Sequence, residues 1–155
     1  MSAALSLPTT SNLDAMVRID IVEARLLSLG GEMAAPRGGS FTRAPVKHHF
    51  TPGLYTREIF MPAGSILTSK IHKTEHPFVV SKGRCFVYMG GSSWVSITAP
   101  HFGITYPGTR RLLVILEDTI WTTFHVTDLT DVGEIEDEII EKRQNPLLPM
   151  MEDAA

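Results

Sequence analysis

The amino-acid sequence predicts an all-β fold, a small antiparallel β-barrel with a helical segment at each end. Between residues 51 and 127, short β-rich runs are separated by proline, glycine and acidic turn residues, and no helix-length periodic segment interrupts them. The eight runs are Leu54–Met61, Ser65–Ile71, Phe78–Ser81, Arg84–Met89, Trp94–Thr98, Gly103–Tyr106, Leu112–Leu116 and Thr119–Val126. Short strands at this spacing are typical of a sandwich or barrel and argue against an α/β fold.

The chain divides into three parts of different character. Residues 1–50 are expected to form an N-terminal helix and a flexible arm, residues 51–127 the barrel, and residues 128–155 a C-terminal helix with an apolar tail. The arm includes the stretch 30–45, where four glycines and two prolines favour a loop. At 155 residues the whole chain fits one domain with extensions at its ends.

The N-terminal helix is predicted from apolar residues at helical spacing between Leu13 and Leu29. Ser11 or Asn12 can cap its start, and the Gly30-Gly31 pair can end it. The alternation of Val17, Ile19 and Ile21 keeps a strand as the alternative for the same segment.

The C-terminal helix is predicted over 131–143. Asp131 and Glu134 resemble a capping box, and Asn145-Pro146 is expected to stop the helix. Apolar residues form a stripe on the helix and continue in the tail: Val132, Ile135, Ile139, Ile140, Leu147, Leu148, Met150 and Met151. Because exposed apolar patches usually mark interfaces, we expect this segment to pack on another subunit and give a homo-oligomer.

Composition excludes several classes of protein. The formal charge of −3 argues against a nucleic-acid-binding surface, which is normally basic. The single cysteine, Cys85, excludes an internal disulfide and is expected in the core. No apolar run is long enough for a membrane span, and the first residues lack the pattern of a signal peptide. We therefore expect a soluble protein of a reducing cytoplasm.

The spacing of residues 64–83 is the most informative pattern. It reads Gly64, five residues, Lys70-Ile71-His72, three residues, His76, six residues and Gly83. Residues at i and i+2 of a strand point to the same face, so this spacing places side chains inside a barrel, and Gly83 makes the tight turn that follows.

This spacing resembles the first motif of the cupin superfamily, Gly-x5-His-x-His-x(3 or 4)-Glu-x6-Gly. The run 106–111, Tyr-Pro-Gly-Thr-Arg-Arg, resembles the second motif more loosely, with Arg111 at the place of its histidine. The resemblance covers residues 54–127 and implies a cupin-like jelly roll. The runs 73–76 and 117–123 also resemble short cupin-like proteins encoded by bacteriophages and prophages.

In the family, the motif residues hold a divalent metal in the barrel. Carried over here, the ligand positions hold Lys70, His72, His76 and Arg111, and Glu75 can turn inward to pair with either cation. Lysine coordinates a metal only when neutral and arginine in effect never does, so the four-ligand site is absent. The candidate pocket residues are Lys70, His72, Glu75, His76, Arg111 and Trp121, and none is assigned a catalytic role.

Two chemistries remain open for this pocket. His72, His76 and His125 offer three imidazoles for a divalent transition metal, and the alternative is that they are hydrogen-bonded without metal. Lys70 and Arg111 beside histidines would instead favour a carboxylate or a phosphate.

These patterns predict a non-enzymatic, oligomeric cupin-like protein with a degenerate metal pocket, associated with a phage virion or its assembly and with other virion proteins as partners. It would act in the host cytoplasm or in the assembled virion. The alternative is a metal-dependent small-molecule-binding protein, or a small cupin enzyme of isomerase, dioxygenase or lyase type.

Overall fold

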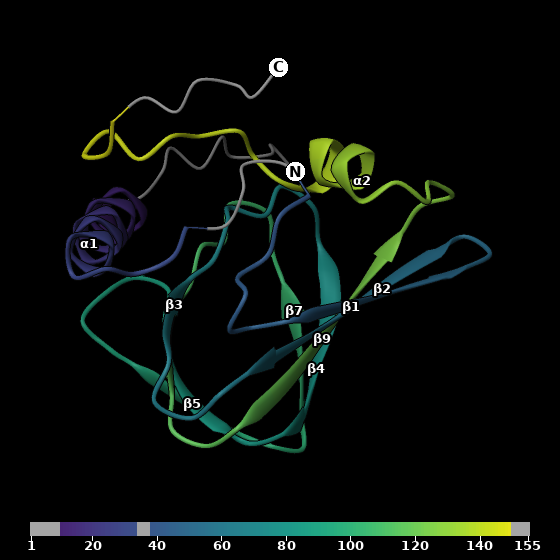
Figure 1. The fold of residues 1–155 in the computed structure, drawn as a ribbon, viewed down its shortest axis with the longest axis horizontal. Helices are drawn as coiled ribbons and strands as arrows, with labels where there is room; N and C mark the ends of the chain where they lie inside the picture. Colours follow the sequence, from purple (N-terminus) through teal and green to yellow (C-terminus); the bar gives the residue numbers. More distant parts are fainter. Residues whose placement is uncertain (1–9, 34–37, 150–155) are drawn as a thin grey trace, which may run out of the picture.

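Two antiparallel sheets lie against each other in the computed structural model, which describes residues 10–33 and 38–149 (Figure 1). In chain order the elements are α1 (Thr10–Ser28), β1 (Val46–Thr51), β2 (Leu54–Met61), β3 (Ile66–Thr68), β4 (His76–Lys82), β5 (Arg84–Tyr88), β6 (Val95–Thr98), β7 (His101–Thr105), β8 (Leu112–Ile115), β9 (Thr119–Val126) and α2 (Val132–Ile139).

The strand order is that of a jelly roll. One sheet has the order β1-β2-β9-β4-β7 and the other β3-β8-β5-β6, with antiparallel pairing between neighbours. Consecutive strands therefore alternate between the sheets over much of the chain, as in a double-sheet Greek key. The predicted all-β, cupin-like barrel is confirmed, and the eight predicted strands correspond to β2–β9.

Strand β1 lies within residues 46–51, most of which the sequence analysis assigned to the arm. It pairs with β2 at the edge of the five-stranded sheet, and five of its six residues are exposed. An exposed edge strand lacks the alternation of apolar and polar residues that identifies a strand in the sequence, so it was missed. The boundaries proposed between arm, barrel and tail stay a prediction.

The core lies between the two sheets. Strand β9 shows how it is built, because its residues alternate between the interior and the outer face and leave Trp121 buried. Cys85 is buried opposite, as predicted, and burial raises the pKa of its thiol to about 11. The other buried apolar members of this core include Met61, Leu67, Phe78, Val80, Val87, Ile97, Leu113 and Ile115.

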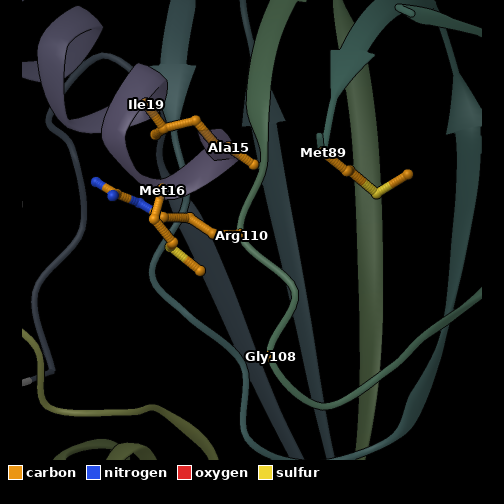
Figure 2. A pocket seen from close by; sticks show the side chains of 6 residues that line it. All are labelled: Ala15, Met16, Ile19, Met89, Gly108 and Arg110. Carbon is orange, nitrogen blue, oxygen red and sulfur yellow. The ribbon is translucent and has the colours of Figure 1, made fainter. Parts of the chain in front are cut away.

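Helix α1 confirms the predicted N-terminal helix and excludes the strand alternative. It packs Ala15 and Ile19 on Tyr88 and Leu112, on the face of the four-stranded sheet that points away from the core. Ser11 and Asn12 lie inside the helix, so the predicted cap position is wrong. A hollow of only about 10 Å³ remains beside α1, so the contact is nearly closed. Figure 2 shows the residues that line it.

The end of α1 matches its prediction. Gly30 adopts a φ of 89°, and the N–H of Gly31 donates to the carbonyl of Leu26 at 2.9 Å. This is the glycine-terminated helix end that satisfies the last carbonyls of a helix.

Helix α2 begins where predicted but ends early. Its N-cap Asp131 accepts a hydrogen bond from the N–H of Glu134, as a capping residue does. The helix stops at Ile139 instead of at Asn145-Pro146, because Ile140 becomes extended and forms a bridge with His72. Tertiary pairing with the barrel thus ends the helix before proline can.

The apolar stripe of α2 is covered by its own barrel. Ile135 and Ile139 are 0% and 7% exposed and pack on Tyr55 of β2. The helix stripe therefore does not supply the exposed patch that the sequence analysis expected. Leu147 remains exposed, and the predicted tail contacts of Met150 and Met151 lie outside the described residues.

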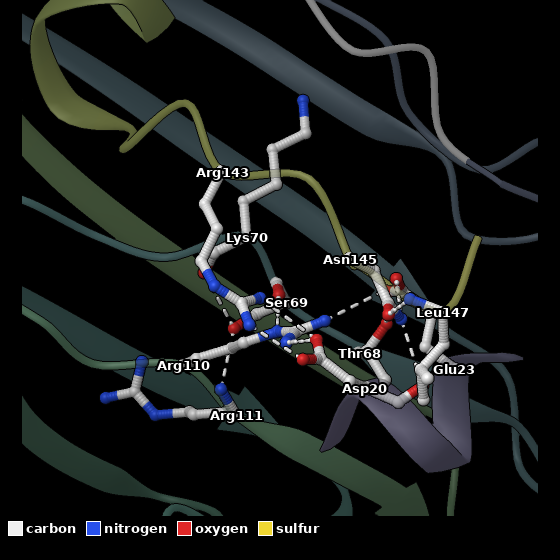
Figure 3. Close-up of polar contacts among 10 residues, drawn as sticks. All are labelled: Asp20, Glu23, Thr68, Ser69, Lys70, Arg110, Arg111, Arg143, Asn145 and Leu147. Carbon is white, nitrogen blue, oxygen red and sulfur yellow. Dashed lines mark hydrogen bonds and ion pairs between the residues drawn. The ribbon is translucent and has the colours of Figure 1, made fainter. Parts of the chain in front are cut away.

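A partly buried ionic cluster, which we call the Asp20 clamp (Asp20, Glu23, Arg110, Arg143 and Asn145), ties α1 and the segment after α2 to the barrel (Figure 3). Asp20 contacts Arg110 at 2.6 Å and Arg143 at 2.7 Å, and its carbonyl accepts from the Asn145 amide. Burial alone would raise the pKa of Asp20, but hydrogen bonds from the two arginines hold it below its ordinary value.

Candidate binding site inside the barrel

Three imidazoles meet in the interior, and we call them the histidine cluster (His72, His76 and His125). His76 begins β4, His125 lies on β9, and His72 lies between β3 and β4, where its backbone bridges to Ile140. Ring centroids are 4.9 Å apart for His72 and His76 and 4.3 Å apart for His76 and His125. The structure thus places the three predicted candidate metal ligands side by side.

Arg111 lies in the same interior, directly before β8. Its side chain is buried, and its guanidinium donates to the Thr105 hydroxyl at 2.9 Å. The guanidinium also lies over the rings of Phe78 and Trp121, 5.1 and 5.4 Å from their centroids. The predicted pocket residue Trp121 is therefore adjacent to Arg111, and desolvation lowers the pKa of Arg111 to about 10.

Two predicted pocket residues lie elsewhere. The ammonium of Lys70 pairs with Glu136 of α2 at 3.0 Å, outside the histidine cluster. Strand β3 ends at Thr68, so the alternation of strand residues does not carry Lys70 inward with the histidine two positions later. Glu75 is exposed and forms no ion pair with Lys70 or Arg111 among the described residues.

A second arginine, Arg57 of β2, was not among the predicted pocket residues. Its Cα pairs with that of inward-facing Thr123, and its neighbours on the same strand face are Tyr55 and Ile59. The Thr123 hydroxyl lies 2.9 Å from Nε2 of His125, so the register places Arg57 on the strand next to the cluster. After desolvation, which is the largest cause, the charge of Arg57 also contributes to the lowered pKa of His72 and His125. Strand alternation could have found it, but cationic side chains on strands usually face solvent.

The imidazoles of the cluster are neutral at pH 7. Desolvation is the largest cause and lowers the pKa of His125 to about 3 and that of His72 well below its ordinary value. The pKa of His76 is also lowered, by desolvation and by the nearby charge of Arg111. A neutral imidazole has one donor nitrogen and one acceptor nitrogen.

One of these tautomers can be assigned from its contact. Nδ1 of His76 lies 3.0 Å from the carbonyl of Thr74, which can only accept, so Nδ1 carries the proton. Nε2 of His76 therefore presents a lone pair, and it is buried without a hydrogen-bond partner among the described residues. Nδ1 of His72 and Nδ1 of His125 are buried and unpartnered in the same way.

These residues do not form a metal site as they lie. In the described ranges, no group of three or more histidine, cysteine, aspartate or glutamate side chains is arranged to hold a metal ion. The positions of two guanidiniums near the cluster also disfavour a divalent cation, because like charges repel at short distance in a buried site.

The larger surface hollow lies away from the histidine cluster. It has a volume of about 260 Å³ and opens on the outer face of the five-stranded sheet. Its lining residues are Pro45, Lys47, Glu58, Phe60 and Ile120. Any ligand of the interior cluster is therefore bound by different residues from a ligand of this hollow.

Comparisons with solved structures agree with the jelly roll. A salicylate 1,2-dioxygenase variant from Pseudoaminobacter salicylatoxidans matches with a TM-score of 0.50 and 12% identity, over 78% of this chain and 34% of that one. A double-stranded β-helix protein of Klebsiella pneumoniae matches at a TM-score of 0.49 and 15% identity, over 66% of this chain and 89% of that one. At 12% identity the match at a TM-score of 0.50 shows the fold alone.

A DMSP lyase from Ruegeria pomeroyi matches at a TM-score of 0.48 and 14% identity, over 57% of this chain and 49% of that one. The chain thus spans about half of this lyase and a third of the dioxygenase. No protein-family model and no curated protein matches the sequence. In the part of the chain that the structure describes, no helix is long and apolar enough to cross a membrane.

Proposed function

We propose that this chain is a non-enzymatic cupin-like protein whose barrel binds a ligand without catalytic metal. The observation that carries this proposal is the place of Arg111. It stands where the second cupin motif has its histidine, and its guanidinium lies buried near the histidine cluster. A guanidinium stays protonated and does not coordinate a metal, so the fourth ligand of the family's site is replaced by a positive charge.

Elemental analysis of protein purified from metal-supplemented medium tests this proposal. The wild-type chain is expected to hold far less than one transition-metal ion per chain. Arg111→His restores the missing imidazole and removes the charge, so it should gain metal, while the exposed control Arg84→His should not. A wild-type protein with about one tightly held ion per chain would overturn the proposal.

We also propose that the protein is a homo-oligomeric component of a phage virion or of its assembly, acting in the host cytoplasm or the particle. Its sequence support is the resemblance of residues 73–76 and 117–123 to phage-encoded cupin-like proteins. Its structural support is the edge strand β7, where Phe102 and Ile104 are exposed at 64% and 36%, and Tyr106 directly after it, exposed at 60%. Exposed apolar edges of this kind invite pairing with another chain.

The solution mass tests the oligomeric part. We expect more than one chain per particle, and Phe102→Lys should lower the mass, whereas the control Thr98→Lys on exposed β6 should not. A monomeric wild-type protein at micromolar concentration would contradict homo-oligomerisation. Co-purification with phage particles tests the virion association.

The alternative function, a metal-dependent binding protein or small cupin enzyme, is favoured by one observation. His76 donates through Nδ1 to a backbone carbonyl and leaves Nε2 free, as metal-binding histidines commonly do. If the elemental analysis found metal, His72, His76 and His125 would be the ligands to replace with alanine. Each replacement should then lower the metal content.

A further inference from the structure

We propose that the barrel interior binds a small oxyanion that also carries a hydroxyl group, with Arg57 and Arg111 holding the charge and Nε2 of His76 accepting from the hydroxyl. The proposal rests on the proposed function, since it names the ligand class of the same metal-free site. Inorganic phosphate and a 2-hydroxycarboxylate share this chemistry, because both combine anionic oxygens with an O–H donor at neutral pH.

The two arginines of the interior lack a nearby counter-charge in the part of the chain that the structure describes. Within the described residues, no carboxylate lies at ion-pairing distance from the guanidinium of Arg57 or of Arg111. The carboxylate that acts on Arg57 from farther away, Glu136, is engaged by Lys70 and by the N–H of Gly38. Cations in a low-dielectric interior without a counter-charge are unfavourable, so an anion bound beside them would be stabilised.

The neighbouring residue shows that this lack of pairing is specific to the interior. Arg110 and Arg111 are consecutive and both are 6% exposed. Arg110 contacts the carboxylates of Asp20 and Glu23, whereas the Arg111 guanidinium contacts the neutral Thr105 hydroxyl and points away from the clamp (Figure 3). The fold therefore supplies carboxylates to Arg110 and none to Arg111 among the described residues.

The hydroxyl requirement follows from His76. Its Nε2 lone pair is buried and unpartnered, and a fully deprotonated anion such as sulfate offers it only acceptor atoms. An anion with an O–H group can instead donate to Nε2 while its other oxygens accept from the guanidiniums. The site should therefore distinguish phosphate from sulfate, which have nearly the same size and shape.

Isothermal titration of the full chain at constant ionic strength tests the proposal. Phosphate is compared with sulfate, and lactate with propionate, so that each pair differs in its hydroxyl donor. At least one hydroxyl-bearing anion should bind about tenfold more tightly than its partner, the ratio expected when a buried acceptor is left unpaired. Tighter phosphate binding indicates a phosphate ligand, and tighter lactate binding indicates a hydroxy acid. If neither pair differs, or neither binds, the proposal is wrong.

Matched variants assign the effect to the named residues. Arg57→Gln and Arg111→Gln should each weaken binding by about tenfold or more, while the exposed control Arg84→Gln should leave it unchanged. His76→Phe should abolish the preference for phosphate over sulfate. Circular dichroism checks that each variant is folded, and a folded double variant Arg57→Gln/Arg111→Gln that still binds phosphate would overturn the proposal.

The outcome is separable from that of the proposed function. A metal-free protein that binds none of the four anions would leave the metal-free cupin-like role standing and reject the anion. A protein with a resident metal ion would reject the proposed function, whatever the anions do.

Discussion

The Asp20 clamp and the histidine cluster are two buried polar regions that the same dipeptide connects. Arg110 enters the clamp, where Asp20 and Glu23 neutralise it, and Arg111 enters the barrel, where no described carboxylate pairs with it. Burial is equal at the two positions, so burial does not distinguish a structural ion pair from a binding site. The presence or absence of a counter-charge distinguishes them, because a buried charge without a partner is unfavourable until a ligand of opposite charge binds.

Removing the Asp20 carboxylate from the clamp should have the largest effect on the free energy of unfolding. Asp20→Ala leaves Arg110 buried without its main partner and should lower the free energy of unfolding by about 3–5 kcal/mol. Urea denaturation measures this loss. The control Asp14→Ala breaks an exposed pair with Arg18 on the same helix and should cost at most about 0.5 kcal/mol. Equal losses in the two variants would show that the clamp is not a stabilising ionic cluster.

Acidification should affect the two regions over different pH ranges. The pKa of His125 is about 3 in the folded protein and near its ordinary 6.5 when unfolded, so the unfolded chain binds the proton first. The free energy of unfolding therefore decreases as the pH falls from 6.5 towards 3. At pH 5 the decrease due to His125 is roughly 2 kcal/mol.

The clamp behaves differently because the depressed pKa belongs to a carboxyl group. Asp20 contributes stability above its ordinary pKa of 3.8, and this is lost as the pH falls below that value. Thermal melts between pH 7 and pH 3 should show that the melting temperature already falls between pH 6.5 and pH 4, and His125→Phe should reduce this decrease. A melting temperature that falls only below pH 4 would contradict the inference that the imidazoles are neutral in the folded protein.

Replacing Arg111 by a neutral residue should change the free energy of unfolding by less than Asp20→Ala does, and in the opposite direction. Arg111→Gln removes an unpaired buried charge, so in phosphate-free buffer it should raise the free energy of unfolding by about 1–2 kcal/mol. Arg110→Gln, at the same exposure, should lower it, because two carboxylates lose their partner. Differential scanning calorimetry compares the two variants, and a decrease in both would remove the distinction between clamp and interior.

Lys70→Met should have the smallest effect. Lys70 is partly exposed and pairs with Glu136 outside the cluster, so its loss should cost less than about 1 kcal/mol. Phosphate binding should remain within twofold of wild type. A large loss of binding would return Lys70 to the site that the sequence analysis proposed for it.

Much of the fold could be predicted because its signals are local. The alternation of buried and exposed residues on β9 and the turn residues between runs identify strands without knowledge of their partners. Gly83 was expected at a tight turn, and a side chain there would run into the carbonyl of Asp118 and the side chain of Thr119. Each of these features depends on residues close together in the chain or on backbone conformation.

The site was predicted only in part. Motif spacing and strand alternation brought His72, His76 and His125 into one candidate group, and the structure places their rings together. Spacing failed for Lys70, because the chain leaves the strand geometry after Thr68. It also gave no reason to select Arg57, because the lack of a carboxylate partner for this arginine among the described residues is visible only in the folded chain.

The sequence by itself determined strands β2–β9, the turns between them and the identity of the interior imidazoles, because periodicity and backbone preference act over a few residues. Only the tertiary structure decided which charges are paired. Asp20 meets Arg110 and Arg143 across 90 and 123 residues, α2 ends where Ile140 meets His72, and Arg111 receives no carboxylate among the described residues. Coulombic compensation depends on distance in space and on burial, and neither quantity exists until the two sheets and the ends of the chain have packed together.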